Sequence, residues 1–429
     1  MELLEELAME EENKKTFFTN KEVFSTKYQP KNIIHRDEEF KKVFKTLAPI
    51  LKGEQPPHIF MYGGTGTGKS LVVDKVLSFL YSKNQENMEY YFFNCMAGTT
   101  TLSEYQILQN MLEDMGVRKN QGYSAEVLSK ELFEALAKKG DKNIVFVFDE
   151  LDALLKNRNS EFLYKLLRAE EIYASKAKSS KARETNQIEL NCKITIIGIS
   201  NSSNILSLLD ARTKSSLTCS SFIFKPYNAV QLVDILTDRA IEGLEKDTYD
   251  EELIPIVGAK TGRDSGDARK GIAYLKSCAE IAYEQGLDII SKDLVDEAIA
   301  RANLDKLSEI IEIQPPHRKA VLYAALMAMN IVKHNLVSNK KENLVLEEIE
   351  ASKVFNKYVE ICKILGWAPV TDRQVRDHIK EWEILEVLRT KLSYQGRHGR
   401  SKIVEFTYSS NIRDRVIDEL ENLLNLKSD

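Results

Sequence analysis

Short apolar runs alternate with helical periodicity from about residue 33 to residue 227. Five of these runs are rich in β-branched or aromatic residues and nearly continuous in apolarity, which is typical of strands buried on both faces of a parallel sheet. The predicted strands are His58–Tyr62, Glu89–Asn94, Asn143–Phe148, Lys193–Ser200 and Ser221–Phe224. Helical segments separate them, as βαβ crossovers require. This half of the chain is therefore predicted to form one α/β domain with a parallel sheet.

The apolar pattern changes after residue 229. Up to about Ile313 it is almost entirely helical, with apolar residues such as Leu232 and Leu236 recurring at helical spacing. Gln314-Pro315-Pro316 predicts the end of a helix and a linker. The pattern thus divides the chain into an acidic N-terminal tail (1–20), an α/β core (21–226), a helical domain (227–313) and a C-terminal domain (314–429).

Charge and cysteine content change this picture little. The chain of 429 residues has a formal net charge of −5, so any basic surface for nucleic acid must be local. The five cysteines lie far apart, which favours buried thiols in a reducing cytosol over disulfides. Residues 1–15 lack the pattern of a signal peptide, and no apolar run approaches 18 residues, so we expect a cytoplasmic protein. Glu170–Leu190 is predicted to be an exposed insertion.

A glycine-rich sequence follows the first predicted strand and precedes a predicted helix over Leu71–Tyr81. It satisfies G-x-x-x-x-G-K-[ST], a phosphate-binding pattern in this strand-loop-helix context. Its members are Gly63, Gly64, Thr65, Gly66, Thr67, Gly68, Lys69 and Ser70. Glycines let backbone N–H groups turn toward phosphate oxygens, and the helix N-terminus adds partial positive charge. The sequence predicts a site for ATP or ADP, with Lys69 on the β- and γ-phosphates and Ser70 on Mg²⁺.

Polar residues follow two further predicted strands. Asp149 and Glu150 come directly after Asn143–Phe148, at the edge where α/β sheets bind ligands. We expect Asp149 to hold Mg²⁺ and Glu150 to orient the attacking water; the alternative is a charge pair at a helix N-terminus. Asn201 follows the strand that ends at Ser200, and either contacts the γ-phosphate or caps the next turn.

The order of these pieces resembles the AAA+ ATPases, and within them the archaeal replication initiators. That family is similar to the eukaryotic origin recognition complex subunit one and to the cell-division-cycle helicase loader. The resemblance extends from Tyr28 to about Tyr408. It rests on the phosphate loop, Tyr28-Gln29-Pro30, His35-Arg36-Asp37-Glu38-Glu39, Phe148-Asp149-Glu150-Leu151-Asp152, Gly198-Ile199-Ser200-Asn201, Leu209-Asp210-Ala211-Arg212, Ser215-Ser216-Leu217 and Ser265-Gly266-Asp267-Ala268-Arg269-Lys270.

The resemblance assigns further roles. The region from Tyr28 to Arg36 resembles the family's adenine-side box, with Tyr28 and Arg36 expected to bind the nucleotide, and Asn201 resembles its first sensor. Arg269 resembles the second sensor, a cation that reaches the phosphates from the lid. Arg212 resembles the arginine finger offered to a neighbouring subunit's ATP, although Ala211 stands where the family commonly has proline. Without the resemblance, both arginines would be interpreted as surface residues.

The C-terminal segment resembles a winged helix. Thr371 is predicted to cap a helix from Asp372 to about Leu385 that turns Val375, Ile379 and Trp382 to one face. Away from that face lie the predicted DNA contacts of the recognition helix: Arg373, Arg376 and Lys380. The predicted wing adds Arg397, Arg400 and Lys402. A winged helix used for protein contact is the alternative. The family also has a DNA-contacting motif, expected here within Met96–Gly122, with Thr99-Thr100-Thr101.

The resemblance implies a replication initiator. It would bind double-stranded origin DNA in an ATP-regulated manner, beside other initiator subunits, and help load the replicative helicase. Slow hydrolysis of ATP to ADP and phosphate would act as a switch, and the protein would be cytoplasmic and nucleoid-associated. The alternatives are an ATP-dependent DNA-binding regulator of transcription or plasmid maintenance, and an AAA+ remodelling ATPase with sustained turnover.

Overall fold

A computed structural model describes the chain over residues 16–26, 28–97, 100–117, 122–156, 160–169, 190–202, 209, 219–329, 333–334, 341–342, 348–394 and 400–426. These residues fall into two compact units, residues 1–295 and 296–429. Within the described part, no helix has the length and apolarity needed to cross a bilayer.

The first unit is built on a five-stranded parallel sheet with the order β2-β5-β6-β1-β7. Its strands are β1 (His58–Gly63), β2 (Met88–Asn94), β5 (Asn143–Asp149), β6 (Lys193–Ser200) and β7 (Cys219–Phe224). The predicted parallel sheet is confirmed. The prediction succeeded because β5 and β6 are two of the three inner strands, and their continuous apolar runs are buried on both faces.

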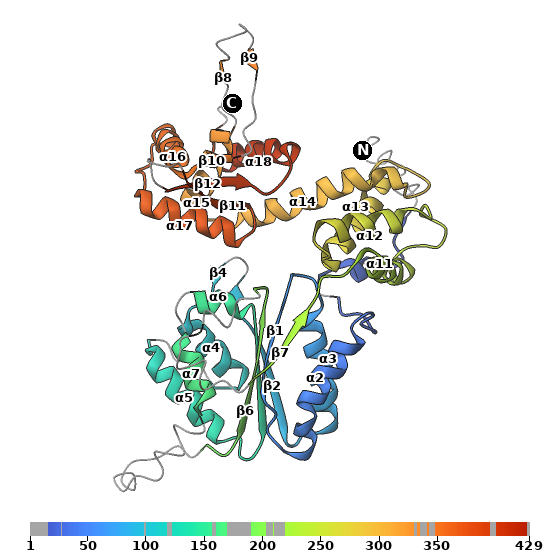
Figure 1. The fold of residues 1–429 in the computed structure, drawn as a ribbon, viewed down its shortest axis with the longest axis vertical. Coiled ribbons are helices and arrows are strands. Elements are labelled where there is room, and N and C mark those ends of the chain that lie inside the picture. Colours follow the sequence, from blue (N-terminus) through green and yellow to red (C-terminus); the bar gives the residue numbers. More distant parts are fainter. Residues whose placement is uncertain are drawn as a thin grey trace, which may run out of the picture. The chain divides into compact units, whose positions relative to one another are not determined.

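Helices cover both faces of this sheet (Figure 1). One face carries α2 (Asp37–Leu47), the 3₁₀ turn η2 (Ala48–Lys52) and α3 (Lys69–Lys83), whose Val72 and Val76 pack with Met61 of β1. On the other face, Phe146 and Phe148 of β5 pack with the helices α4 to α7. Those helices are α4 (Glu104–Asp114), α5 (Ala125–Ala137), α6 (Leu151–Lys156) and α7 (Ser160–Leu167). A short hairpin, β3 (Met96–Ala97) and β4 (Thr100–Thr101), precedes α4.

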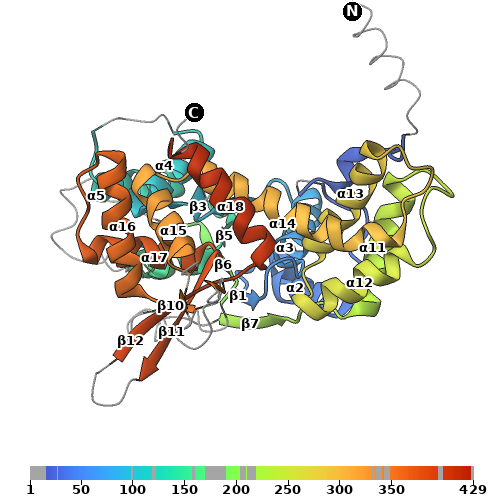
Figure 2. The same ribbon diagram turned by 90° about the horizontal axis from the view of Figure 1, so that it is seen from above.

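A group of helices completes the first unit, and we call α11 (Ala229–Gly243), α12 (Leu253–Asp264) and α13 (Ala268–Glu284) the lid (Figures 1 and 2). The described residues between 16 and 35 form a strap against it, with the turn η1 (Lys21–Phe24). Phe17 is buried, and Thr19 donates from its backbone N–H to the Gly243 carbonyl at 3.0 Å. Residues 16–20 therefore differ from the predicted tail 1–20, because their aromatic side chains pack on the lid.

The second unit contains a three-stranded antiparallel sheet with the order β10-β12-β11 and a set of helices around one core. The strands are β10 (Glu348–Glu350), β11 (Leu388–Tyr394) and β12 (Arg400–Phe406), and β11 and β12 project as a hairpin, the wing (Figure 2). The helices are α14 (Val295–Glu312), α15 (Pro316–Met329), α16 (Ala351–Leu365), α17 (Asp372–Ile384) and α18 (Ser410–Leu423), and a short pair is formed by β8 (Lys333–His334) and β9 (Lys341–Glu342).

The boundary between the units lies one helix earlier than the sequence predicts. Leu307 and Ile311 of α14 belong to the same core as α15, so α14 belongs to the second unit rather than to the helical domain 227–313. Pro316 is the first residue of α15. Proline is well tolerated at that position, because the N–H it lacks would have no partner within the helix. The proline pair, which predicts a linker, therefore lies at the start of a helix whose first residue is Pro316.

Candidate functional site

The phosphate loop, residues 63–70, connects β1 to α3 in a conformation that only glycine adopts easily. Gly66 and Gly68 have φ values of +62° and +87°, in the left-handed region. A Cβ on Gly63 would lie 2.1 Å from the Phe224 carbonyl oxygen of the neighbouring strand. These two features explain why glycine occupies these positions, and they direct the loop around the N-terminus of α3.

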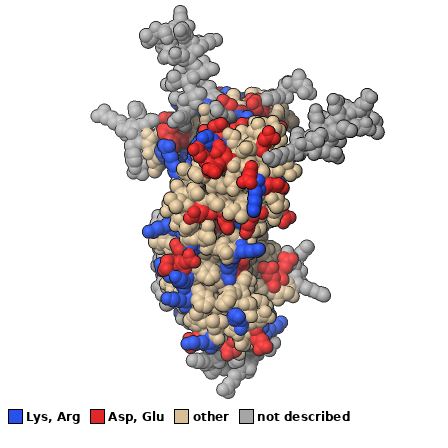
Figure 3. Space-filling model, turned by 90° about the vertical axis from the view of Figure 1, so that its right-hand side faces the viewer, with Lys and Arg blue, Asp and Glu red and all other residues tan. Residues whose placement is uncertain are grey.

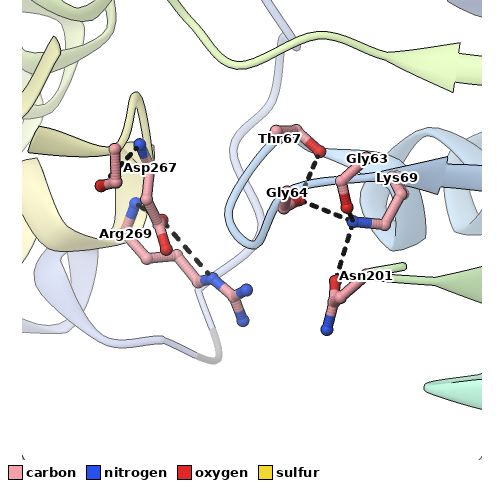
Figure 4. A network of polar contacts seen from close by, with 8 residues as sticks. Gly63, Gly64, Thr67, Lys69, Asn201, Asp267 and Arg269 are labelled. Carbon is pink, nitrogen blue, oxygen red and sulfur yellow. Dashed lines mark hydrogen bonds and ion pairs between the residues drawn. The ribbon is translucent and has the colours of Figure 1, made fainter. Parts of the chain in front are cut away.

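Lys69 lies at the centre of the site. Its side chain is only 5% exposed and donates to the carbonyl oxygens of Gly63 and Gly64 at 2.8 and 2.7 Å, and to Asn201 Oδ1 at 3.0 Å (Figure 4). Burial lowers the pKa of Lys69 to about 8, although the nearby Asp149 carboxylate acts in the opposite direction. Lys69 is thus a desolvated cation whose present partners are neutral oxygens, which an anionic phosphate can replace.

The carboxyl end of β5 supplies the acidic part of the site. Ser70 Oγ donates to Asp149 Oδ2 at 2.5 Å. A hydroxyl and a carboxylate at this distance are hard oxygen donors, the type that Mg²⁺ takes alongside nucleotide phosphates. Glu150 has a φ of +55°, which is strained for a residue other than glycine. Burial, followed by the negative charge of Asp149, raises the pKa of Glu150, while a hydrogen bond with Asn94 acts against the rise.

Asn201 is held in place by an acidic residue that sequence reasoning did not assign a role. Asp152 lies on α6 and accepts from Ser200 Oγ at 2.8 Å and from the Asn201 backbone N–H at 3.3 Å. The carboxylate therefore fixes the end of β6 beside the acidic end of β5. Its position two residues after Glu150 was the signal available in the sequence.

The lid contributes Arg269 and Asp267. Asp267 precedes α13 and accepts the Arg269 backbone N–H at 2.8 Å, which is the hydrogen bond of a helix cap. The Arg269 side chain is 58% exposed and extends toward the side where Lys69 and Asn201 lie (Figure 4). Asp267 touches the phosphate loop, since a Cβ on Gly66 would lie 1.6 Å from its Oδ1.

These groups surround a cavity of about 640 Å³. Loop residues, the two acidic residues and Asn201 line one part of it, and Arg269 contributes from the lid. Tyr28 and the apolar residues Val23, Phe24, Ile33 and Ile34 of the strap line another part. The volume is within the range of small-molecule sites and includes a polar, cationic part and an apolar part, as a nucleotide requires.

Arg36 does not lie on the adenine side, and this corrects the sequence prediction. Its side chain is 4% exposed and does not line the cavity. It donates to the carbonyl oxygens of Thr67 at 2.9 Å and Lys225 at 2.6 Å, and its guanidinium lies 4.0 Å from the Tyr227 ring centroid. Arg36 therefore supports the phosphate loop from behind, by tying it to the residue that follows β7.

In the second unit, α17 matches the predicted recognition helix. Thr371 and Gln374 form a capping box, and Val375, Ile379 and Trp382 are buried. Two of its three predicted DNA contacts are already in ion pairs, Arg376 with Asp372 at 2.7 Å and Lys380 with Asp377 at 3.0 Å.

Arg373 is exposed and has no ion pair with the other described residues. On the wing, Lys402 lies 3.6 Å from Glu383. Positive and negative side chains are interspersed on the face that Figure 3 shows. The basic residues of α17 are thus accompanied by acidic neighbours that the sequence prediction did not weigh.

Comparisons with known proteins agree with this arrangement. Three family models match: an AAA domain over residues 52–180, the Cdc6 AAA+ ATPase-type lid domain over 233–300 and the CDC6 C-terminal winged helix domain over 309–415. The ORC1-type DNA replication protein 1 of Sulfurisphaera tokodaii is 30% identical over 408 residues, covering 94% of each chain. The ORC1-type DNA replication protein of Pyrococcus abyssi is 32% identical over 393 residues, covering 90% of this chain and 86% of the relative. The chain belongs to the ORC1-type DNA replication proteins.

The solved structures extend the likeness to the whole fold of an ORC1-type protein. The Aeropyrum pernix ORC1 protein in complex with DNA has a TM-score of 0.76 and 26% identity, covering 96% of this chain and 99% of its own. CDC6P from Pyrobaculum aerophilum, with a TM-score of 0.54 and 19% identity, shares the fold. The predicted architecture of an AAA+ ATPase with a lid and a C-terminal winged helix is confirmed, and so is the resemblance to replication initiators.

Several expected residues of this ORC1-type protein lie outside the described part of the chain. They are Arg212 and Arg397, the side chain of Arg400, Thr99, and residues 170–189 of the predicted insertion. Their assigned roles stay predictions.

Proposed function

We propose that this ORC1-type ATPase is an initiator that binds origin DNA under the control of ATP and helps load the replicative helicase. One observation carries the proposal: a single cavity joins the phosphate loop, the acidic end of β5, Asn201 and the lid residue Arg269. A winged helix follows in the same chain, and a DNA complex of the similar Aeropyrum pernix ORC1 protein supports a role in DNA binding.

Each polar residue of the cavity has a separate role in ATP binding and hydrolysis. Backbone N–H groups of the loop and the Lys69 ammonium bind the β- and γ-phosphates. Ser70 and Asp149 are the residues that would hold Mg²⁺, which neutralises phosphate charge when bound. Glu150 orients the attacking water and accepts its proton, and Asn201 and Arg269 contact the γ-phosphate from two sides.

The lid provides a path from nucleotide to the rest of the protein. Asp267 touches Gly66, and Arg269 follows two residues later on the same helix cap. A γ-phosphate draws Arg269 inward and repels the Asp267 carboxylate, so ATP and ADP favour different lid positions. Such a difference suits a slow, switch-like ATPase. Arg212 would act on the ATP of a neighbouring initiator subunit, and the protein would work on the nucleoid.

The proposal is tested by measuring ATP affinity and DNA affinity on the same preparation of the protein. Lys69→Ala should abolish or greatly weaken ATP binding measured by titration calorimetry, because it removes the principal phosphate cation. The affinity for origin DNA should then no longer respond to added ATP. Normal ATP affinity in Lys69→Ala would contradict the site, and fast hydrolysis by a stable hexamer would favour a remodelling ATPase.

A further inference from the structure

A second buried cation, Arg239 on the lid helix α11, lines the same cavity and has no role in the chemistry above. The residue is 7% exposed. Its neighbour one turn earlier on the helix, Ile235, also lines the cavity, so this face of α11 is the one turned toward it. Among the described residues, Nη1 of Arg239 has no hydrogen-bond partner.

On the strap, the neighbour of Arg239 is Tyr28. Its guanidinium lies 4.6 Å from the ring centroid of Tyr28, and the Tyr28 hydroxyl donates to Glu242 at 2.5 Å. The strap thus supports the guanidinium on one side while Nη1 keeps an unused N–H. A buried donor without an acceptor is costly, and a ligand that brings an acceptor removes that cost.

Arg239 lies in a different electrostatic environment from the phosphate-binding groups. The charges that act on Lys69 are Asp149, Arg269, Asp267 and Asp152. Those that act on Arg239 are Glu242 and Asp238, on its own lid helix. The part of the cavity beside Arg239 is therefore the nucleoside part, which also has the apolar lining of the strap.

We propose that Arg239 is a base-reading residue, whose guanidinium donates a hydrogen bond to a ring nitrogen of the purine while Tyr28 holds it in place. The inference rests on the proposed ATP site and adds the means by which the site selects a purine. A ring nitrogen with a free lone pair is the acceptor that the base offers to a forked donor.

The experiment compares Arg239→Met with the wild type by titration calorimetry, using ATP, its 1-, 3- and 7-deaza analogues, 2′-deoxy-ATP and inorganic tripolyphosphate. Methionine keeps an apolar stem of similar length and removes the donor. Arg263→Met is the matched control, since Arg263 is an exposed lid cation that does not line the cavity.

Arg239→Met should bind ATP about tenfold more weakly, as loss of one charged donor predicts. One deaza analogue should bind the wild type about tenfold more weakly than ATP does. The affinity of that analogue for Arg239→Met should equal its affinity for the wild type. Tripolyphosphate should bind both proteins equally, and Arg263→Met should resemble the wild type throughout. The melting temperature of nucleotide-free Arg239→Met should equal or exceed that of the wild type, because an unsatisfied buried donor has been removed.

Unchanged ATP affinity in Arg239→Met would overturn the inference. An equal loss for every ligand, tripolyphosphate included, would show an effect through packing or the phosphates, and an extra loss confined to 2′-deoxy-ATP would move the contact to the ribose; either outcome also overturns it. The proposed function fails in a different way: the wild type would then bind ATP no better than Lys69→Ala.

Discussion

Lys69 combines two properties that elsewhere exclude each other, a positive charge and nearly complete burial. The protein keeps the charge by giving Nζ three oxygen acceptors, Gly63, Gly64 and Asn201. The pKa of about 8 shows that this compensation is incomplete. A bound phosphate supplies the missing negative charge, so nucleotide binding and protonation of Lys69 favour each other.

ATP affinity should therefore fall as pH rises above about 8. Below that pH, Lys69 is already charged and the affinity should be nearly constant. Above it, binding must take up a proton, and affinity should drop up to tenfold per pH unit until the pKa of the bound state is reached. Calorimetry at pH 7 and about pH 9.5, in buffers of different ionisation enthalpy, measures both the affinity and the proton uptake. Equal affinity at the two pH values would contradict this account of Lys69.

Hydrolysis should respond to pH in the opposite range, through Glu150. A carboxylate must be ionised to accept a proton from water, and the pKa of Glu150 is raised by burial and by Asp149. Single-turnover hydrolysis at saturating ATP should therefore decline as pH falls through that raised pKa. An ordinary glutamate is half protonated at about pH 4.3. Glu150→Gln should bind ATP and hydrolyse it at a low rate that does not vary with pH. A wild-type rate that is level down to pH 4.5 would exclude Glu150 as the base.

At the scale of elements, the phosphate loop meets the lid where Gly66 lies against Asp267. Gly66 has a positive φ and no room for a Cβ. Gly140 offers a matched control, since its φ is +66° and a Cβ there would meet nothing within 4 Å. The two glycines share the backbone conformation and differ in the contact.

Gly66→Ala should therefore lower the free energy of unfolding more than Gly140→Ala does. The control should lose about 1 kcal/mol of unfolding free energy from backbone strain alone. Gly66→Ala should lose that amount plus the cost of displacing Asp267, about 2–4 kcal/mol in total, and should also weaken ATP binding. Urea unfolding of the first unit and ATP titration measure the two effects. Equal losses for the two variants would show that the Gly66–Asp267 contact does not hold the lid.

The helix α17, predicted to be the recognition helix, carries acidic neighbours that pair with some of its basic residues and not with others. Arg373→Ala should weaken DNA binding and reduce the slope of log affinity against log salt by about 0.9, the effect of one phosphate contact. Arg376→Ala should have a smaller effect, because Arg376 must first leave Asp372. Fluorescence anisotropy with a DNA duplex at several salt concentrations separates the two. Equal losses in the two variants would show that the ion pair with Asp372 does not restrain Arg376. No loss in either variant would favour a winged helix that contacts protein.

The sequence predicted elements better than the contacts between them. The five strands were found within two residues, because buried parallel strands have long apolar runs, and the α17 cap followed from Thr371. Arg36 was misassigned because a buried arginine behind a loop has the same sequence context as one lining a pocket. Arg239 was missed because an arginine on an amphipathic helix usually faces solvent.

At the scale of the molecule, the chain folds into two compact units, and the net charge of −5 leaves DNA binding to local surfaces. The sequence predicted a division into domains but put this boundary at residue 314. Two consecutive prolines are compatible with a linker and also with the start of a helix, and the sequence does not distinguish the two. Only the packing of Leu307 and Ile311 shows that α14 belongs with the winged helix.

Control by ATP of where this ORC1-type protein binds DNA can be measured by genome-wide footprinting on chromosomal DNA of the source organism. The footprints are compared with ATP, with ADP, and with Glu150→Gln in ATP. We expect protection concentrated where replication starts, with a pattern that differs between ATP and ADP and that Glu150→Gln keeps in its ATP form. Footprints spread over promoters and identical with either nucleotide would contradict this expectation.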